Sequence, residues 1–180
     1  MTKEEKLIFL KEVKKILDEN DIKFWIDAGT LLGAIRDNDF IEWDKDIDIS
    51  TMEKNKNKIA DLKNEFNKIG KFGAHIREND YLASHYILKG DFKIDIYYWK
   101  DIGNEYICYA NREFISVISP EYFKKLKKIR FKDIEIPVPD NTIEYLKEHY
   151  GESWIIPDKN WQENRKRFFK PLKDYVQYLK

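Results

Sequence analysis

The sequence predicts an α+β fold in which helices flank a mixed β-sheet, built as a single domain over residues 1–180. Three observations support this prediction. Apolar residues recur at helical spacing near the N-terminus, later runs alternate apolar and polar residues as strands do, and turn-forming residues separate these runs. Hydrophobic residues make up 42% of the 180-residue chain and aromatic residues 15%, which is enough for a packed core.

The N-terminal elements follow from capping and periodicity. Thr2 and Glu5 form a capping-box pattern at the start of an amphipathic helix. A strand is predicted next over Ile22–Asp27, then a short helix after Gly29 and a second strand over Ile47–Thr51. The apolar positions of the first helix are Leu7, Leu10, Val13 and Leu17.

The middle of the chain reads as one helix followed by strands. A lysine-rich helix is predicted over Glu53–Ile69, with an apolar residue at every third or fourth position. Short polar turns separate the strand-like runs that follow, and the first three of these runs are predicted to form an antiparallel meander. The runs are Ala74–Arg77, Tyr81–Leu88, Phe92–Trp99, Tyr106–Tyr109 and Phe114–Ile118.

Three further elements are predicted before residue 152. Ser119 and Pro120 predict a helix start, because serine caps helices and proline fits the first helical turn. A hairpin is predicted over Ile129–Val138, and a helix from about Asn141 to Tyr150. Gly151 then ends that helix.

The last segment, Trp161–Lys180, is predicted to be a basic helical segment interrupted by Pro171. Two uses are open for it. It could contact a membrane surface peripherally, near a lipid-linked glycan. The commoner arrangement is packing on the body of the protein, with lysine stems covering the edges. A second basic run, with no acid among residues 124–132, could attract an anionic acceptor or simply guard an edge strand.

The charge balance, the cysteine count and the hydropathy of the sequence exclude several classes of protein. Lysine and arginine number 33 against 33 aspartate and glutamate, so no general nucleic-acid partner is expected. A single cysteine excludes an intramolecular disulfide, and the N-terminus does not resemble a signal peptide, which together predict a cytoplasmic protein. No apolar run approaches the roughly 20 residues needed to cross a bilayer. A structural zinc site is not expected, because the cysteine and the three histidines are not spaced as zinc ligands are. These residues are Cys108, His75, His85 and His149.

The active site is predicted at a run of acidic residues, 44–48. Asp44, Asp46 and Asp48 are two residues apart, so on an extended chain their carboxylates share one face. Like charges this close repel unless a cation neutralises them. Hard oxygen ligands of this kind suit Mg²⁺ or Mn²⁺. We therefore predict a divalent-metal site at these three residues.

Two other features extend this site. Asp95 lies inside an apolar strand-like run, where an acid needs a partner, and a neighbouring strand would bring it to Asp46 and Asp48. Gly29 and Thr30 lie where a strand turns into a helix, a position that suits phosphate binding. Metal-binding aspartates close to a phosphate-binding helix start are the arrangement that phosphoryl or nucleotidyl transfer needs.

Simpler explanations exist for each feature alone. An acidic run such as 44–48 is often a solvated turn, although the alternating isoleucines would not be needed there. It also lacks the glycine and the distal glutamate of an EF-hand loop. Asp95 could be a hydrogen-bonded edge-strand residue. The combination of all three features is what favours a catalytic site.

The same residues resemble a known family. Residues 25–36 (WIDAGTLLGAIR) and 40–49 (FIEWDKDIDI) are similar to the motifs of the LicD family, which includes bacterial phosphocholine transferases and fukutin-related ribitol-phosphate transferases. Residues 92–99 (FKIDIYYW) resemble its third-acid strand, and residues 136–157 its C-terminal block. The resemblance implies a nucleotidyltransferase-like fold and a CDP-activated donor.

The resemblance also implies roles for individual residues. Asp46 and Asp48 would bind the metal, and Asp95 would join them or act as a base. Asp44 would be a further ligand or would orient one. Gly29 and Thr30 would hold the donor diphosphate. Arg36 would either pair with a phosphate or form a salt bridge to Asp37 or Asp39.

The implied reaction moves a phospho-alcohol, such as phosphocholine, from CDP to a hydroxyl of a glycan or lipid-linked glycan and releases CMP. The alternative is a nucleotidyltransferase that moves NMP from an NTP to a small hydroxylated acceptor. One metal cage serves either reaction, so the acids do not decide between them.

Overall fold

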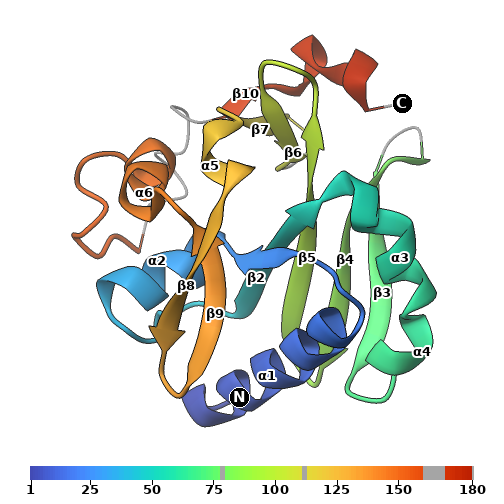
Figure 1. Ribbon diagram of the computed structural model, residues 1–180, viewed down its shortest axis with the longest axis vertical. Helices are drawn as coiled ribbons and strands as arrows, with labels where there is room; N and C mark the ends of the chain where they lie inside the picture. The colour runs from blue at the N-terminus through green and yellow to red at the C-terminus, as the bar shows by residue number, and fades with distance from the viewer. Residues whose placement is uncertain (78–79, 111–112, 160–168, 180) are drawn as a thin grey trace.

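A computed structural model describes residues 1–77, 80–110, 113–159 and 169–179 of the chain (Figure 1). Within these residues, eight strands form one mixed sheet and two more form a separate antiparallel ribbon. Helices pack around the sheet. This is the α+β architecture, with a mixed sheet flanked by helices, that the sequence predicts.

The central strand of the sheet is β5 (Phe92–Asp101). β2 (Asp46–Met52) pairs with it in parallel, and β4 (Leu82–Lys89) pairs with it antiparallel along the other edge. Outside these, β1 (Phe24–Ile26) pairs antiparallel with β2, and β3 (Lys71–Ile76) pairs antiparallel with β4. This half of the sheet therefore has the order β1-β2-β5-β4-β3.

The last two residues of β5 begin a second, smaller part of the sheet. There β6 (Tyr106–Tyr109) pairs with β5, β7 (Phe114–Ile118) pairs with β6, and β10 (Phe169–Pro171) pairs with β7, all antiparallel. The separate ribbon consists of β8 (Leu126–Phe131) and β9 (Ile134–Pro139), and β9 contacts β1. The predicted meander and hairpin are both confirmed.

The helices flank this framework. The predicted capping box is present at α1, where the Thr2 side chain and the Glu5 side chain each bond the other residue's backbone N–H. α2 connects β1 to β2, and α3 and α4 lie beside β3 in Figure 1. Among the described residues, no helix is both long and apolar enough to cross a membrane. The helices are α1 (Lys3–Glu19), α2 (Ala28–Arg36), η1 (Glu53–Asn55), α3 (Lys56–Asp61), α4 (Lys63–Phe66), α5 (Glu121–Lys124), α6 (Thr142–Tyr150), η4 (Leu172–Asp174) and η5 (Val176–Tyr178).

The core forms on one face of the central strands. Ile47 and Ile49 of β2 and Ile94 and Ile96 of β5 are completely buried. The apolar side of α1 joins them in one cluster, because its helical period brings its large apolar residues to one face. The four isoleucines alternate with the acidic residues of the same strands, so the core fixes the direction in which the acids point.

Two predictions are corrected. The helix predicted over Glu53–Ile69 is divided into η1, α3 and α4, with a break at Leu62. Of the predicted helical segment Trp161–Lys180, residues 160–168 and 180 lie outside the described part. Residues 169–179 form β10 and two 3₁₀ turns instead of an α-helix, since the backbone bonds of β10 go to β7 and Pro171 cannot donate within a helix.

Candidate active site

The parallel pairing of β2 and β5 gathers the charged residues of both strands on one face of the sheet. In the register of the pair, Asp46 lies opposite Lys93 and Asp48 lies opposite Asp95. Residues opposite each other in a ladder point to the same face. The structure thus brings Asp95 beside Asp48, as the sequence analysis expects.

Asp44 joins this group from the loop that precedes β2. One carboxylate oxygen from each of Asp44, Asp46 and Asp48 can be chosen so that all three lie within 4.8 Å of one another. Asp48 is buried, whereas Asp44 and Asp46 are partly exposed. The cluster is therefore open to solvent on one side and closed by the sheet on the other.

Burial, together with neighbouring negative charge, raises the pKa values of Asp44, Asp48 and Asp95. Burial is the main reason that the pKa of Asp44 rises to about 7, and a hydrogen bond with Asp46 adds to the effect. Burial, followed by the charges of the neighbouring aspartates, raises the pKa of Asp48 well above its usual value. The pKa of Asp95 is also raised by burial, although its Lys93 partner acts against the rise. A bound cation would relieve this concentration of negative charge.

Asp95 is the most deeply buried acid of the group, with an exposed fraction of 1%. Its Oδ2 atom accepts a hydrogen bond from the Lys93 ammonium, and the same ammonium lies 3.3 Å from Asp46 Oδ2. Its Oδ1 atom has no hydrogen-bond partner, and His75 Nε2 lies 3.5 Å away. A buried carboxylate oxygen without a partner is costly, which marks this atom as one that a ligand could satisfy.

Gly29 makes room for the acidic cluster. A Cβ atom built at Gly29 would lie 2.2 Å from Asp44 Oδ2 and 3.7 Å from Asp48 Oδ2. Only glycine therefore allows the Asp44 carboxylate to lie over the first turn of α2. A helix N-terminus attracts negative charge, so this placement is also electrostatically favourable.

Thr30 of α2 is hydrogen-bonded to β2. Its side chain is buried, and its hydroxyl oxygen accepts a hydrogen bond of 2.9 Å from the Asp48 backbone N–H. The Asp48 carbonyl oxygen accepts a bond from the Asp27 N–H. Both backbone groups of Asp48, its N–H and its carbonyl oxygen, are thus bonded to the start of α2, which fixes the direction of its side chain.

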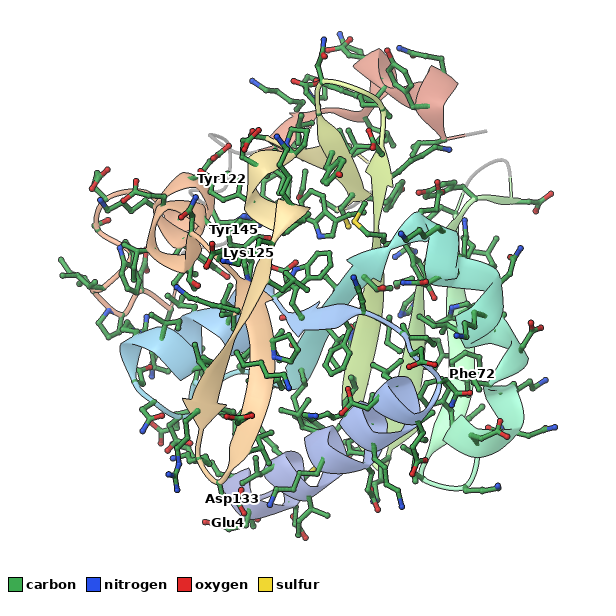
Figure 2. All side chains as sticks on the ribbon, viewed as in Figure 1. Glu4, Phe72, Tyr122, Lys125, Asp133 and Tyr145 are labelled. Atoms are coloured by element: carbon green, nitrogen blue, oxygen red, sulfur yellow. The ribbon has the colours of Figure 1, made fainter. Side chains whose placement is uncertain are left out.

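Asp27 joins the site to the C-terminal half of the chain. It is the N-cap of α2, and its buried carboxylate accepts hydrogen bonds from the Ala28 N–H, the Trp99 indole and the Tyr145 hydroxyl, the last at 2.6 Å. Figure 2 shows Tyr145 beside Tyr122, next to the β8–β9 ribbon. Three neutral donors thus solvate the Asp27 charge, and α6 is held against α2.

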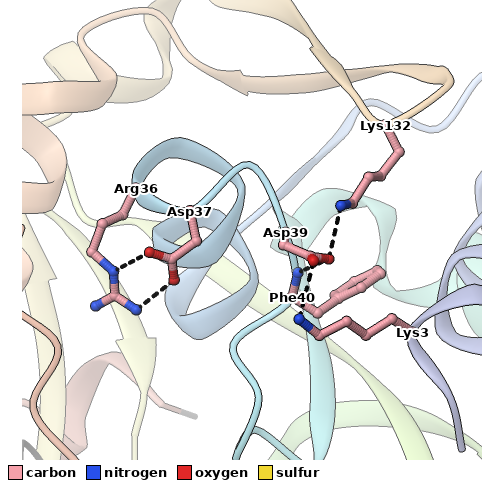
Figure 3. A network of polar contacts seen from close by, with 6 residues as sticks. All are labelled: Lys3, Arg36, Asp37, Asp39, Phe40 and Lys132. Carbon is pink, nitrogen blue, oxygen red and sulfur yellow. Dashed lines mark hydrogen bonds and ion pairs between the residues drawn. The ribbon is translucent and has the colours of Figure 1, made fainter.

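Arg36 lies apart from the acids in this structure. Its guanidinium forms two bonds to Asp37, at 2.9 Å and 2.7 Å, in a bidentate pair (Figure 3). This is the salt bridge that the sequence analysis gave as the alternative to a phosphate contact. In the same view, Asp39 accepts bonds from Lys3 and Lys132, which ties α1 to the β8–β9 turn.

Three residues that contact the acids were not predicted from the sequence. Lys93 bridges Asp46 and Asp95, and His75 approaches the same Asp95 from β3. Lys6 is buried on α1 and donates a hydrogen bond of 2.7 Å to the Asp44 carbonyl oxygen. The position of Lys93, two residues before Asp95 on one strand, was a signal in the sequence. For His75 and Lys6, no local pattern indicates their contacts.

With this geometry established, comparison with known families identifies the domain. Residues 21–141 match the family model "LicD/FKTN/FKRP, nucleotidyltransferase domain". This match covers more than half of the chain and includes every candidate site residue. The chain belongs to the LicD family.

Relatives of this LicD-family chain occur in bacteria and mammals. An uncharacterized protein of Rickettsia prowazekii is 30% identical over 149 residues, which cover 79% of this chain and 53% of the relative. The human protein named ribitol-5-phosphate transferase FKTN is 27% identical over 169 residues, which cover 87% of this chain and 34% of that protein. The LicD-family chain thus spans between a third and about half of the length of these relatives.

Solved structures confirm the nucleotidyltransferase fold. The lincosamide antibiotic adenylyltransferase LnuA superposes with a TM-score of 0.53 at 13% identity, over 89% of this chain and 94% of that one. The antibiotic-resistance factor ANT(2'')-Ia superposes with a TM-score of 0.55 at 12% identity, over 92% of this chain and 83% of that one. At such low identity the likeness concerns the fold alone.

The acids of this LicD-family domain form a donor set that fits a divalent cation. All are carboxylates, which are the oxygen ligands that Mg²⁺ and Mn²⁺ prefer. Burial and neighbouring negative charge raise the pKa values of Asp44, Asp48 and Asp95, and a bound cation would favour their charged forms. Asp95 Oδ1, which accepts no hydrogen bond and has His75 Nε2 at 3.5 Å, is a further oxygen that could act as a ligand on the same strand pair.

Proposed function

We propose that this chain is a transferase that moves a phospho-alcohol, such as phosphocholine or ribitol phosphate, from a CDP-activated donor to a hydroxyl of a glycan or lipid-linked glycan, with Mg²⁺ or Mn²⁺ at the acidic cluster. The proposal rests on one observation, the convergence of four carboxylates from two paired strands and the loop before them. Membership of the LicD family and the fukutin relatives named ribitol-5-phosphate transferases support a phospho-alcohol as the group transferred.

In this proposal Asp46, Asp48 and Asp95 hold the cation, and Asp44 is a further ligand or orients one. When bound, the cation would neutralise charge on the donor phosphates as it develops during transfer. The core isoleucines behind β2 and β5 hold the acids on one face, so the ligand geometry is set before the cation arrives.

The transfer forms one bond and breaks one bond at the same phosphorus. An acceptor hydroxyl oxygen attacks the phosphorus that bears the alcohol, the P–O bond to the CMP phosphate breaks, and CMP leaves with that bond's electron pair. The hydroxyl proton passes to a base in the site. The chain's own contribution is to position donor and acceptor and to exclude competing water.

The start of α2 is the proposed diphosphate subsite. Gly29 has no side chain to cover the backbone there, and a helix N-terminus attracts an anion, although the Ala28 N–H is already bonded to Asp27 Oδ1. Thr30 would contribute through its backbone N–H, because its side chain is buried against β2. Arg36 would reach a donor phosphate only by leaving Asp37, to which it is bound by two hydrogen bonds.

Calorimetric titration tests the proposal without a known acceptor. CDP-choline, CDP-ribitol, CDP-glycerol, CDP, CTP and ATP are titrated into the wild-type chain with Mg²⁺, into the same chain with EDTA, and into Asp46→Asn with Mg²⁺. We expect one CDP-alcohol to bind more tightly than CDP, and we expect this binding to be lost in EDTA and in the variant.

The other outcomes are equally informative. Preference for a triphosphate that disappears in Asp46→Asn would contradict phospho-alcohol transfer and move the assignment to nucleotidyl transfer. Equal binding in all three conditions would contradict the metal site itself. Asp91→Asn, at an exposed position in the β4–β5 turn, is the matched control for the change in charge.

A further inference from the structure

Lys93 occupies a position among the acids that their proposed role as cation ligands does not explain. Its ammonium bonds Asp95 Oδ2 and lies 3.3 Å from Asp46 Oδ2, so one positive charge lies between two of the four carboxylates. Its side chain is 37% exposed, whereas the Asp95 side chain is 1% exposed. The lysine therefore reaches the buried acids from the open side of the site.

Two of the carboxylates proposed to hold the divalent cation, those of Asp46 and Asp95, also bind Lys93. A Mg²⁺ ion lies about 2.1 Å from each ligand oxygen. An ammonium bonded to the same carboxylates would then lie within a few ångströms of a double positive charge. The repulsion at this distance is large even with protein screening, so the ion and the ammonium compete.

We propose that Lys93 is an internal counter-cation, which partly neutralises Asp46 and Asp95 in the metal-free protein and moves to a phosphate oxygen of the donor when the divalent cation binds. This inference rests on the proposed function and adds a positioning residue to it. A lysine has a flexible four-carbon stem and binds phosphate as a point charge, which suits both positions.

Neighbouring basic residues are held elsewhere. Arg36 is bound to Asp37, and Lys6 donates to the Asp44 carbonyl oxygen. Within the described part of the chain, the Lys93 ammonium is bonded only to Asp46 and Asp95, which the cation would bind instead. When those acids bind the ion, the donor diphosphate becomes the nearest anion that the ammonium can pair with.

Mn²⁺ titration in the absence of nucleotide tests the competition. We expect Lys93→Gln to bind Mn²⁺ at least about tenfold more tightly than wild type, which is the effect of removing one charge-assisted hydrogen bond from the ligands. Lys45→Gln is the matched control, because exposed Lys45 lies between Asp44 and Asp46 in sequence and its loss changes the net charge equally. We expect less than about a threefold change there, since exposed charges are screened.

A second titration tests the move to phosphate. With saturating Mn²⁺, we expect CDP to bind Lys93→Gln about tenfold more weakly than wild type, while Lys93→Arg keeps most of the affinity. If Lys93→Gln binds Mn²⁺ no more tightly than Lys45→Gln does, the competition is refuted. If it binds Mn²⁺ more tightly but binds CDP normally, the move to phosphate is refuted.

Chemical labelling of the wild-type chain gives a readout that needs no variant. Acetylation of the Lys93 amine, followed by mass spectrometry, should speed up when Mn²⁺ displaces the ammonium and slow down when CDP is added as well. Lys45 is the internal reference. A Lys93 rate that does not respond to Mn²⁺ overturns the inference. If wild type binds no Mn²⁺ at all, the proposed function fails first, so the two failures are distinguishable.

Discussion

Replacement of Asp44 by asparagine tests whether charge crowding in the cluster lowers the stability of the metal-free protein. Burial and Asp46 raise the pKa of Asp44 from 3.8 to about 7 in the folded chain. The folded state then binds this proton more tightly than the unfolded state does. Stability from this group is therefore complete below pH 3.8 and is lost as the pH rises towards 7.

The size of the effect follows from the shift. One pKa unit corresponds to about 1.4 kcal/mol. The rise in the pKa of Asp44 therefore lowers the free energy of unfolding at pH 8 by about 4 kcal/mol at most. Asp44 is partly exposed, and solvent screening reduces this to about 1–3 kcal/mol. Asp44→Asn removes the charge and keeps the shape, and its amide can donate to Asp46.

The assay is urea unfolding in EDTA at pH 5 and pH 8. We expect the wild-type free energy of unfolding to fall between these values, and Asp44→Asn to exceed wild type by about 1–3 kcal/mol at pH 8 and by less than half as much at pH 5. Asp91→Asn is the control for net charge. A variant that is less stable than wild type at pH 8, or that has the same pH profile, would refute the reasoning.

Three further substitutions test the supports of the cluster. Gly29→Ala should weaken Mn²⁺ binding at least about tenfold, because the added Cβ would lie 2.2 Å from Asp44 Oδ2 and would displace that carboxylate. Calorimetry measures this affinity, and an unchanged value would contradict the close approach. Tyr145→Phe should lower the unfolding free energy by about 1–3 kcal/mol in urea, because it removes a donor from buried Asp27; a loss below about 0.5 kcal/mol would show that the bond contributes little. Thr30→Val should lower the unfolding free energy by about 1–2 kcal/mol, and Thr30→Ser should restore most of it, whereas equal losses in both would attribute the effect to packing.

The sequence was sufficient where local pattern decides the structure. Alternation along residues 46–49 and 93–96 places acids on one face and isoleucines on the other, and the structure has this arrangement because the isoleucines fill the core. The capping box of α1 is likewise a local feature, since both of its bonds join residues three positions apart.

Features that depend on pairing between distant segments were not predictable in this way. The contact of Lys93 with Asp46 exists only because β2 and β5 pair in parallel with this register. Thr30 was expected to hold the donor diphosphate, but the hydrogen bond that its hydroxyl accepts from the Asp48 N–H depends on how α2 and β2 pack and was not expected. Phe169–Pro171 forms a strand because β7 offers a free edge, which overrides the helical pattern of the segment.

Anomalous diffraction from crystals of the wild-type chain grown with Mn²⁺ and CDP would locate the proposed metal site directly. We expect one or more manganese peaks bonded to carboxylate oxygens of Asp46, Asp48 and Asp95, at about 2.2 Å, with the diphosphate on the same ion. We also expect these peaks to vanish in Asp46→Asn. Manganese found only at other carboxylates, or CDP bound away from the β2–β5 face, would contradict the central claim.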